Sequence, residues 1–229
     1  MAGTSEPDTT PGTGPVPSRL AHAPVSAGMV VPYVTLTHRD PARPVWGALN
    51  HARLQQIWLH GLCQVCGQRL EGPWVVVYLR PADFLRGIGP EPGLHPDCGR
   101  YSTHACPMLS GRTDRYNPHP HRRPCGDPDC TCSLWAPPAP DPGEAHRDGQ
   151  PAEAWYEAWI AIEDYTLTSV PRNADTPPAY GVEIRPASRL RKLHKIRDAA
   201  PGTDPGDQPL DLLAALIATR TLFASDGDQ

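Results

Sequence analysis

The spacing of apolar residues first predicts a short helix near residue 50. Asn50 is a favourable N-cap, and Leu54, Ile57 and Trp58 follow it at the spacing that places side chains on one face of a helix. Gly61 is the residue type that most often follows a helix end, because glycine adopts the left-handed conformation without steric penalty. The sequence therefore predicts a helix between Asn50 and Gly61 with one buried face.

Two further helices are predicted before residue 107. The stretch 81–87 begins with proline and ends with glycine, which is typical of a short helix or turn. Pro96 suits the first position of a longer helix, because its missing N–H would have no helical partner there. We expect Tyr101 and Ala105 on the inward face of this helix and Pro107 at its end.

Helical spacing recurs near the C-terminus. Within 187–199, Leu190, Leu193 and Ile196 lie three positions apart, which predicts a helix with these residues inward. A final amphipathic helix is predicted over 209–223. Its apolar face comprises Leu210, Leu213, Leu216 and Ile217.

Strand-like runs lie between these helices. Residues 74–79 are all apolar, aromatic or β-branched, which predicts a strand, whereas Pro32 interrupts the run 30–36 and favours an edge strand or extended arm. In 155–167 the tryptophans fit one helical face, but alternate apolar positions also fit a strand. Segment 181–184 could pair with this stretch across a proline-rich loop.

Composition indicates that regular structure is sparse. Thirty prolines and 20 glycines in 229 residues favour turns and linkers. We expect an α+β fold with a small metal-bound core, a C-terminal β-hairpin, amphipathic helices and much irregular structure. The predicted organisation is a disordered tail over 1–16, a metal-binding domain over 17–135, a proline-rich linker over 136–153, a hairpin and helices packing on that domain over 154–223, and a tail over 224–229.

Net charge and apolar content argue against a membrane or an exported location and against strong binding of nucleic acid by the protein as a whole. The formal net charge of −4 gives the whole protein no positive field for nucleic acid or anionic membrane. No apolar run reaches membrane-spanning length, and residues 1–17 lack the features of an export signal. We therefore expect a cytoplasmic protein without a membrane partner. In that compartment the seven cysteines favour metal ligands or buried thiols over disulfides.

Two pairs of residues have the spacing of a metal site. Cys63 and Cys66 precede Gly67, so one tight turn can direct both sulfur atoms to a single ion. His95 and Cys98 repeat the spacing at the predicted helix start, where both side chains can point to the same side. These four residues, the first ligand set, predict a tetrahedral zinc site without an open position, which favours a structural role.

Other interpretations of the first ligand set stay open. Its residues could be ordinary buried thiols and a surface histidine, or Cys63 and Cys66 could form a redox dithiol, although the surrounding βαβ pattern is absent. The order of knuckle, hairpin and helix-borne pair over 63–106 resembles the treble-clef group of zinc modules. That resemblance implies Cys63 and Cys66 on the knuckle and His95 and Cys98 on the helix.

A second cysteine cluster, Cys125, Cys130 and Cys132, lies in a loop of Gly, Asp and Pro residues. Three nearby thiols with little else to fold around predict a second zinc site. Its fourth ligand is expected among Cys106, His104, His119 and His121. Cys106 would complete eight ligands for two closed sites. A loop of reduced thiols is the alternative, and the spacing fits neither common iron–sulfur pattern.

Basic residues concentrate in one stretch near the C-terminus. They are Arg185, Arg189, Arg191, Lys192, Lys195 and Arg197. A basic helix over 185–197 beside a zinc module could bind nucleic acid, but such a stripe is also typical of a solvated helix face. No zinc-protease, phosphate-loop, dinucleotide or zinc-deaminase motif is present.

Several motifs together resemble a family of uncharacterised actinobacterial and actinophage proteins. The motifs are Pro17-Ser18-Arg19-Leu20-Ala21-His22, the Cys63 and Cys66 knuckle with Gly67, and His95-Pro96-Asp97-Cys98 followed by Cys106-Pro107. The resemblance covers most of 17–199 and implies strands over 159–165 and 181–186, which favours the hairpin. It implies no activity.

We therefore expect a zinc-stabilised binding or interaction module with a protein partner and a structural metal ion. The first alternative is a nucleic-acid-binding accessory or regulatory protein that uses the basic 185–197 helix. The second is a zinc-dependent enzyme, which would need an exchangeable ligand. No catalytic residue and no small-molecule substrate are indicated.

Overall fold

A three-stranded antiparallel sheet forms the centre of the protein in a computed structural model. The structure describes residues 15–117, 124–135, 149–170, 179–184, 190–203, 206 and 208–224. The strand order is β10 (Leu190–Arg197), β7 (Trp155–Ala161), β5 (Trp74–Leu79). All six residues of β5 pair with β7, ending with Leu79 opposite Tyr156. β7 is therefore the central strand.

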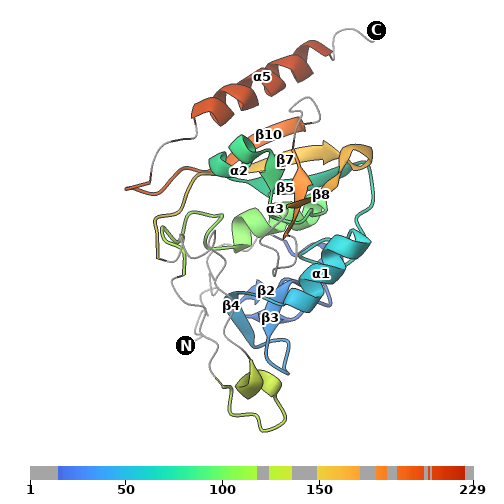
Figure 1. The fold of residues 1–229 in the computed structure, drawn as a ribbon, viewed down its shortest axis with the longest axis vertical. Helices are drawn as coiled ribbons and strands as arrows, with labels where there is room; N and C mark the ends of the chain where they lie inside the picture. Colours follow the sequence, from blue (N-terminus) through green and yellow to red (C-terminus); the bar gives the residue numbers. More distant parts are fainter. Residues whose placement is uncertain are drawn as a thin grey trace, which may run out of the picture.

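Two helices, α3 (Pro96–Ala105) and α5 (Gln208–Ala224), cover opposite faces of this sheet, as Figure 1 shows. The Tyr78 hydroxyl donates to the backbone carbonyl of Gly99 on α3 at 2.7 Å. The Tyr156 hydroxyl donates to the Asp211 carboxylate on α5 at 2.9 Å. Because Tyr156 pairs with the residue next to Tyr78, these two side chains point to opposite faces.

The N-terminal part lies at the end of the molecule away from α5 (Figure 1). It comprises η1 (Ser18–Leu20), β1 (Val25–Ser26), β2 (Met29–Val30), β3 (Thr35–Thr37), β4 (Pro44–Leu49) and α1 (His51–His60). β1 pairs with β2, and β3 pairs with β4. The predicted caps of α1 are confirmed, because the Asn50 side chain accepts the Arg53 N–H at 3.1 Å and Gly61 has a φ of +61°.

The remaining elements are short. They are α2 (Pro81–Arg86), β6 (Ile88–Gly89), η2 (Thr131–Leu134), η3 (Ile162–Asp164), β8 (Leu167–Val170) and β9 (Ala179–Glu183). A second sheet has the order β6-β9-β8. The helices predicted over 81–87 and from Pro96, and the strand predicted over 74–79, are confirmed.

The structure corrects two predictions in the C-terminal part. The stretch 155–167 contains the strand β7, but the partner of β9 is β8, from Leu167 opposite Val182. The predicted hairpin therefore forms one strand later. The helix predicted over 187–199 is wrong over its described part, because Leu190–Arg197 is the strand β10, paired with β7. The final helix is confirmed as α5, but its predicted apolar face only in part, because Leu210 and Ile217 are buried whereas Leu216 is 67% exposed.

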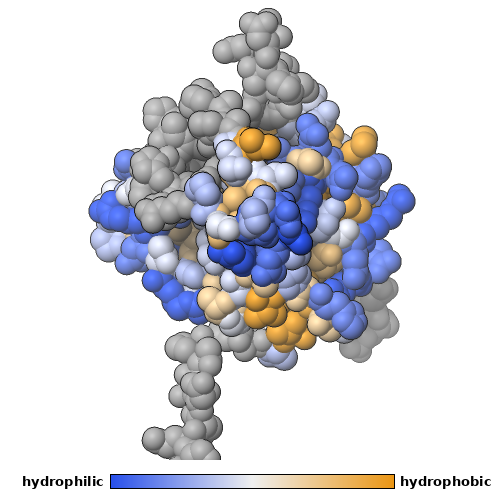
Figure 2. Space-filling model, turned by 90° about the horizontal axis from the view of Figure 1, so that it is seen from below, coloured by the Kyte–Doolittle hydropathy of each residue, from blue (hydrophilic) through white to orange (hydrophobic). Residues whose placement is uncertain are grey.

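The expected α+β class is confirmed, with small helices and antiparallel sheets around one hydrophobic core. Strand β5 lies in the same sheet as β7, so the predicted regions before and after the linker share this core. None of the helices in the described ranges is long and apolar enough to cross a membrane. Figure 2 shows the end that carries the N-terminal strands, where apolar groups are separated by polar side chains.

Candidate metal centres

The structure brings the first ligand set together. The three Sγ atoms and one imidazole nitrogen of Cys63, Cys66, Cys98 and His95 all lie within 4.8 Å of one another. Three of these residues are buried, and Cys66 is half-buried. The four residues thus form a Cys/His cluster that could hold a metal ion.

A tight turn positions the knuckle pair. The Cys63 N–H donates to the Gln68 carbonyl at 2.8 Å, and the Gly67 N–H donates to the Cys63 carbonyl at 2.9 Å. Gly67 has a φ of +72°, and a Cβ there would lie 2.7 Å from the ring of Tyr33. Only glycine fits this turn without strain, which is why the sequence signal at this position is informative.

The other pair lies where α3 begins. His95 is the N-cap of α3, and Cys98 lies in its first turn, where the helix dipole favours a thiolate. His95 Nε2 is 3.0 Å from the Arg69 carbonyl oxygen, and Nδ1 is 3.5 Å from Cys66 Sγ. Because a carbonyl oxygen only accepts, Nε2 carries the proton and Nδ1 faces the sulfur atoms. The imidazole is therefore oriented as a ligand.

Mutual hydrogen bonding shifts the pKa values of the first ligand set. Hydrogen bonds with Cys66 and Cys98 lower the pKa of Cys63, whereas those with Cys63 and Cys66 raise the pKa of Cys98. Burial lowers the pKa of His95, but hydrogen bonds to Cys63 and Cys66 outweigh burial and raise it to about 10. The added proton on Nδ1 occupies the position that a metal ion would take. A cation at the centre would therefore displace protons from the set.

The second cysteine cluster also converges, together with a histidine that the sequence analysis did not select. The ligand atoms of His38, Cys125, Cys130 and Cys132, the second ligand set, lie within 4.8 Å of one another. Cys130 and Cys132 are buried, and the other two residues are half-buried. The Sγ atoms of Cys125 and Cys132 are 3.7 Å apart, and His38 Nδ1 is 3.9 Å from Cys130 Sγ.

Backbone N–H groups shape this loop and point at its sulfur atoms. Asp127 forms the turn, because its carboxylate accepts the Asp129 N–H at 3.0 Å and its carbonyl accepts the Cys130 N–H at 3.1 Å. The Arg39 N–H, 3.4 Å from Cys130 Sγ, lowers the pKa of Cys130 to about 6 against the effect of burial. For Cys132 a similar N–H bond lowers the pKa, but burial and hydrogen bonds with the neighbouring thiols outweigh it, so the net pKa is raised.

The expected fourth ligands of the second cluster are not found in it. Cys106 and His104 belong to neither ligand set, and His119 and His121 lie outside the described residues. Cys106 follows α3, which packs on the central sheet, whereas η2 lies at the far end of the molecule beside the N-terminal strands (Figure 1). His38 takes the place predicted for Cys106 because β3 ends beside this loop.

Both ligand sets offer three thiolates and one imidazole. All seven cysteines are free of disulfides, so their sulfur atoms are available for coordination. Four protein ligands complete a tetrahedron, which leaves no position for water or substrate. Such a donor set suits a soft or borderline divalent ion and a structural role.

The basic residues near the C-terminus are mostly paired with carboxylates or carbonyls. Lys192 Nζ is 3.2 Å from Glu157, and Lys195 Nζ is 2.8 Å from Asp211. Arg197 is buried, and its guanidinium donates to the carbonyls of Met108 and Thr113. Arg191 lies 3.9 Å from Asp164, and Arg185 and Arg189 lie outside the described residues. The described members of the stretch therefore lie on a strand, not on a basic helix.

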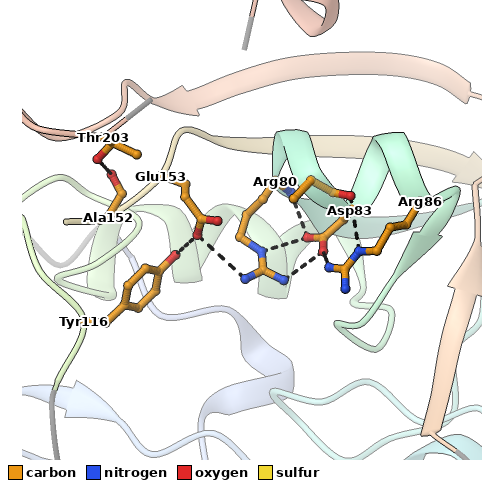
Figure 3. A network of polar contacts seen from close by, with 8 residues as sticks. Arg80, Asp83, Arg86, Tyr116, Ala152, Glu153 and Thr203 are labelled. Atoms are coloured by element: carbon orange, nitrogen blue, oxygen red, sulfur yellow. Dashed lines mark hydrogen bonds and ion pairs between the residues drawn. The ribbon is translucent and has the colours of Figure 1, made fainter. Parts of the chain in front are cut away.

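A buried ion pair, which was not predicted from the sequence, lies at the start of α2 (Figure 3). Asp83 accepts hydrogen bonds from Arg80 Nε and Nη2, both at 2.8 Å, and from Arg86 at 2.6 Å. Glu153 lies 3.7 Å from Arg80 and accepts the Tyr116 hydroxyl at 2.7 Å. The sequence signal was an aspartate in the first turn of a proline-started helix. These contacts connect α2 to the segment before β7 and supply no reactive group.

Comparison of the chain with protein-family models, with curated proteins and with solved structures finds no match. The resemblance to actinobacterial and actinophage proteins therefore stays a prediction. What the structure supports is two Cys/His clusters that could bind metal.

Proposed function

We propose that this protein is an interaction module whose fold depends on a structural zinc ion at the first ligand set. The observation that carries this proposal is the convergence of four soft donors, three of them fully enclosed, in the hydrophobic core. Cys63 and Cys98 are core residues alongside β5 and Tyr101. An ion there would connect the knuckle that follows α1 to the start of α3.

The local arrangement supports a treble-clef-like core. The knuckle follows α1, Leu94 pairs with Val76 on β5, and α3 begins directly after that pairing. His95, at the N-cap, and Cys98, in the first turn of α3, thus face the knuckle directly after this single bridge to β5. Because the tetrahedron is complete without water, this geometry supports stabilisation of the fold rather than catalysis.

Exposed apolar surface supports a protein partner. A groove of about 480 Å³ lies between α1 and residues 162–167, with Trp58, Leu59 and Leu70 along one side. The Leu59 side chain is 78% exposed. Because His60 and Arg69 also line the groove, it suits an amphipathic segment of another protein. Nucleic acid is less well supported as a partner, because carboxylates already pair with basic residues of β10.

The metal is tested by native mass spectrometry with metal quantification on the wild type and on Cys98→Ser. We expect the variant to lose one zinc ion and much of its resistance to urea. Cys106→Ser is the matched control, because Cys106 belongs to neither ligand set, and it should keep the wild-type metal content. A wild-type protein purified without a stoichiometric ion at this set would refute the proposal.

Two further measurements separate this proposal from its alternatives. The cobalt-substituted protein should show the absorption spectrum of closed, thiolate-rich tetrahedral sites. A cobalt ion that also binds an exchangeable water molecule would instead favour an enzyme. Retention on DNA or RNA should be absent at physiological salt. Salt-sensitive retention that Arg191→Ala and Lys192→Ala abolish would favour the nucleic-acid alternative.

A further inference from the structure

The polar contacts of the loop 124–135 with the rest of the described chain converge on one short segment. Arg39 donates to the Asp129 carboxylate at 2.7 Å and lies 3.5 Å from Asp127. Arg43 donates to the Cys125 carbonyl at 3.4 Å. These arginines flank the turn between β3 and β4. Among described residues, the polar and ring contacts of this loop outside itself all go to residues 38–43.

His38 faces the three thiols from that turn. Its ring stacks on Trp135, with centroids 5.0 Å apart and an interplanar angle of 25°. Its backbone N–H donates to the Arg43 carbonyl at 3.0 Å. Both contacts restrict the imidazole, so Nδ1 is directed toward the sulfur atoms rather than toward solvent.

We propose that His38, Cys125, Cys130 and Cys132 bind a second zinc ion, and that this ion docks the loop 124–135 on the turn between β3 and β4. Three thiolates and one imidazole are sufficient for a closed tetrahedral site. The net charge of −1 that a divalent ion leaves is stabilised by the backbone N–H groups of Arg39 and Cys125, which point at the sulfur atoms, while the Arg39 guanidinium pairs with Asp127 and Asp129.

The first ion would stabilise the hydrophobic core, whereas the second would hold only the loop 124–135. Cys63 and Cys98 lie in the hydrophobic core, whereas no residue of 124–135 belongs to the core found in the described ranges. His38 and Cys125 are partly open to solvent. Removal of the second ion therefore releases the loop and leaves the core folded. The loop and the turn both line a groove of about 290 Å³, to which His38, Cys130 and Trp135 contribute, so release of the loop would open this groove.

The experiment uses full-length protein loaded with zinc and titrated with a chelator. Native mass spectrometry counts ions, and iodoacetamide labelling with peptide mapping reports which thiols are free. We expect two ions at first. The first to leave should expose the three cysteines of the loop to alkylation, while Cys63, Cys66 and Cys98 stay protected and the far-ultraviolet circular dichroism is unchanged.

Substitution at His38 tests the ligand assignment. His38→Ala should retain one ion and expose the loop cysteines, whereas His38→Cys should restore two ions, because a fourth thiolate also completes the tetrahedron. His104→Ala is the matched control, since His104 is exposed and outside both sets, and it should retain two ions. Two ions in His38→Ala, or a wild type with one ion and reactive loop cysteines, would overturn the proposal. Neither result affects the first site, which Cys98→Ser tests separately.

Discussion

Replacing Asp83 by alanine should destabilise the protein by about 3–5 kcal/mol, the range for breaking a buried ion pair. Arg80 and Asp83 are 1% and 0% exposed. The carboxylate accepts hydrogen bonds from Arg80 Nε and Nη2 at 2.8 Å and from the Arg80 backbone N–H at 3.0 Å. Without it, the buried guanidinium faces Glu153 at 3.7 Å and the ring of Trp155 at 5.3 Å. This partial compensation favours the lower end of the range.

Three related variants separate the contributions. Asp83→Asn keeps an acceptor for the Arg80 backbone N–H, so it isolates the loss of charge from the loss of the helix cap, which is about 1 kcal/mol. Arg86→Ala is the control, because that side chain is 60% exposed and its ion pair should contribute under about 1 kcal/mol. Arg80→Met combined with Asp83→Leu removes both charges and should cost less than Asp83→Ala alone.

The assay is urea unfolding followed by circular dichroism, with metal content checked for each variant. Similar m values would show that the free energies refer to the same transition. A cost of under about 1 kcal/mol for Asp83→Ala would contradict the coupling that the geometry of the buried pair implies. So would a double variant whose cost equals the sum of the costs of Arg80→Met and Asp83→Leu made separately.

Three other predictions concern separate parts of the fold. Gly67→Ala should cost about 2 kcal/mol or more and weaken zinc retention at the first set, because of the positive φ and the contact with Tyr33; urea unfolding and metal analysis would show it. Asn50→Ala should cost about 1 kcal/mol in urea by loss of the α1 cap. Stability should fall as pH rises from about 10 to 12, because burial raises the pKa of both Tyr116 and Tyr165 to about 12 while the unfolded chain ionises near 10. Urea unfolding at pH 9 and 11 should show a smaller loss for Tyr116→Phe.

Local signals in the sequence were sufficient for the elements around the first ligand set. Asn50, Gly61 and Pro96 act through backbone geometry within a few residues of themselves, so their effect does not depend on distant packing. The same holds for Cys63 and Gly67, where the turn itself needs the residue types present. This is why both pairs of the first set could be placed before any tertiary contact was known.

The strand β10 could not be distinguished from a helix by periodicity. Leu190 and Leu193 are three positions apart, yet both are buried on one face, since an extra residue lies between Leu190 and Lys192 in the pairing with β7. A β-bulge of this kind converts the two-residue period of a strand into a three-residue spacing. The pairing with β7 decides the structure, and that contact is not encoded locally.

His38 had no local signal as a ligand. It is 92 residues from Cys130, and the residues around it resemble an ordinary turn. The cysteine spacing predicted that a fourth ligand was needed but not where it would come from. Only the position of β3 beside the loop identifies His38 as the fourth ligand. Cys106 is nearer to the loop in sequence, but it follows α3 and lies away from the loop.

The chain order of the ligands has a consequence for synthesis. Cys66 and His95 are separated by 29 residues, and His38 and Cys130 by 92. At about 5–20 residues per second, a ribosome completes the first set within seconds and before any cysteine of the loop exists. The later thiols therefore cannot compete for the ion while the knuckle closes. His38, the first of these residues to be made, waits longest for its partners, so the proposed second site would be the last to be completed.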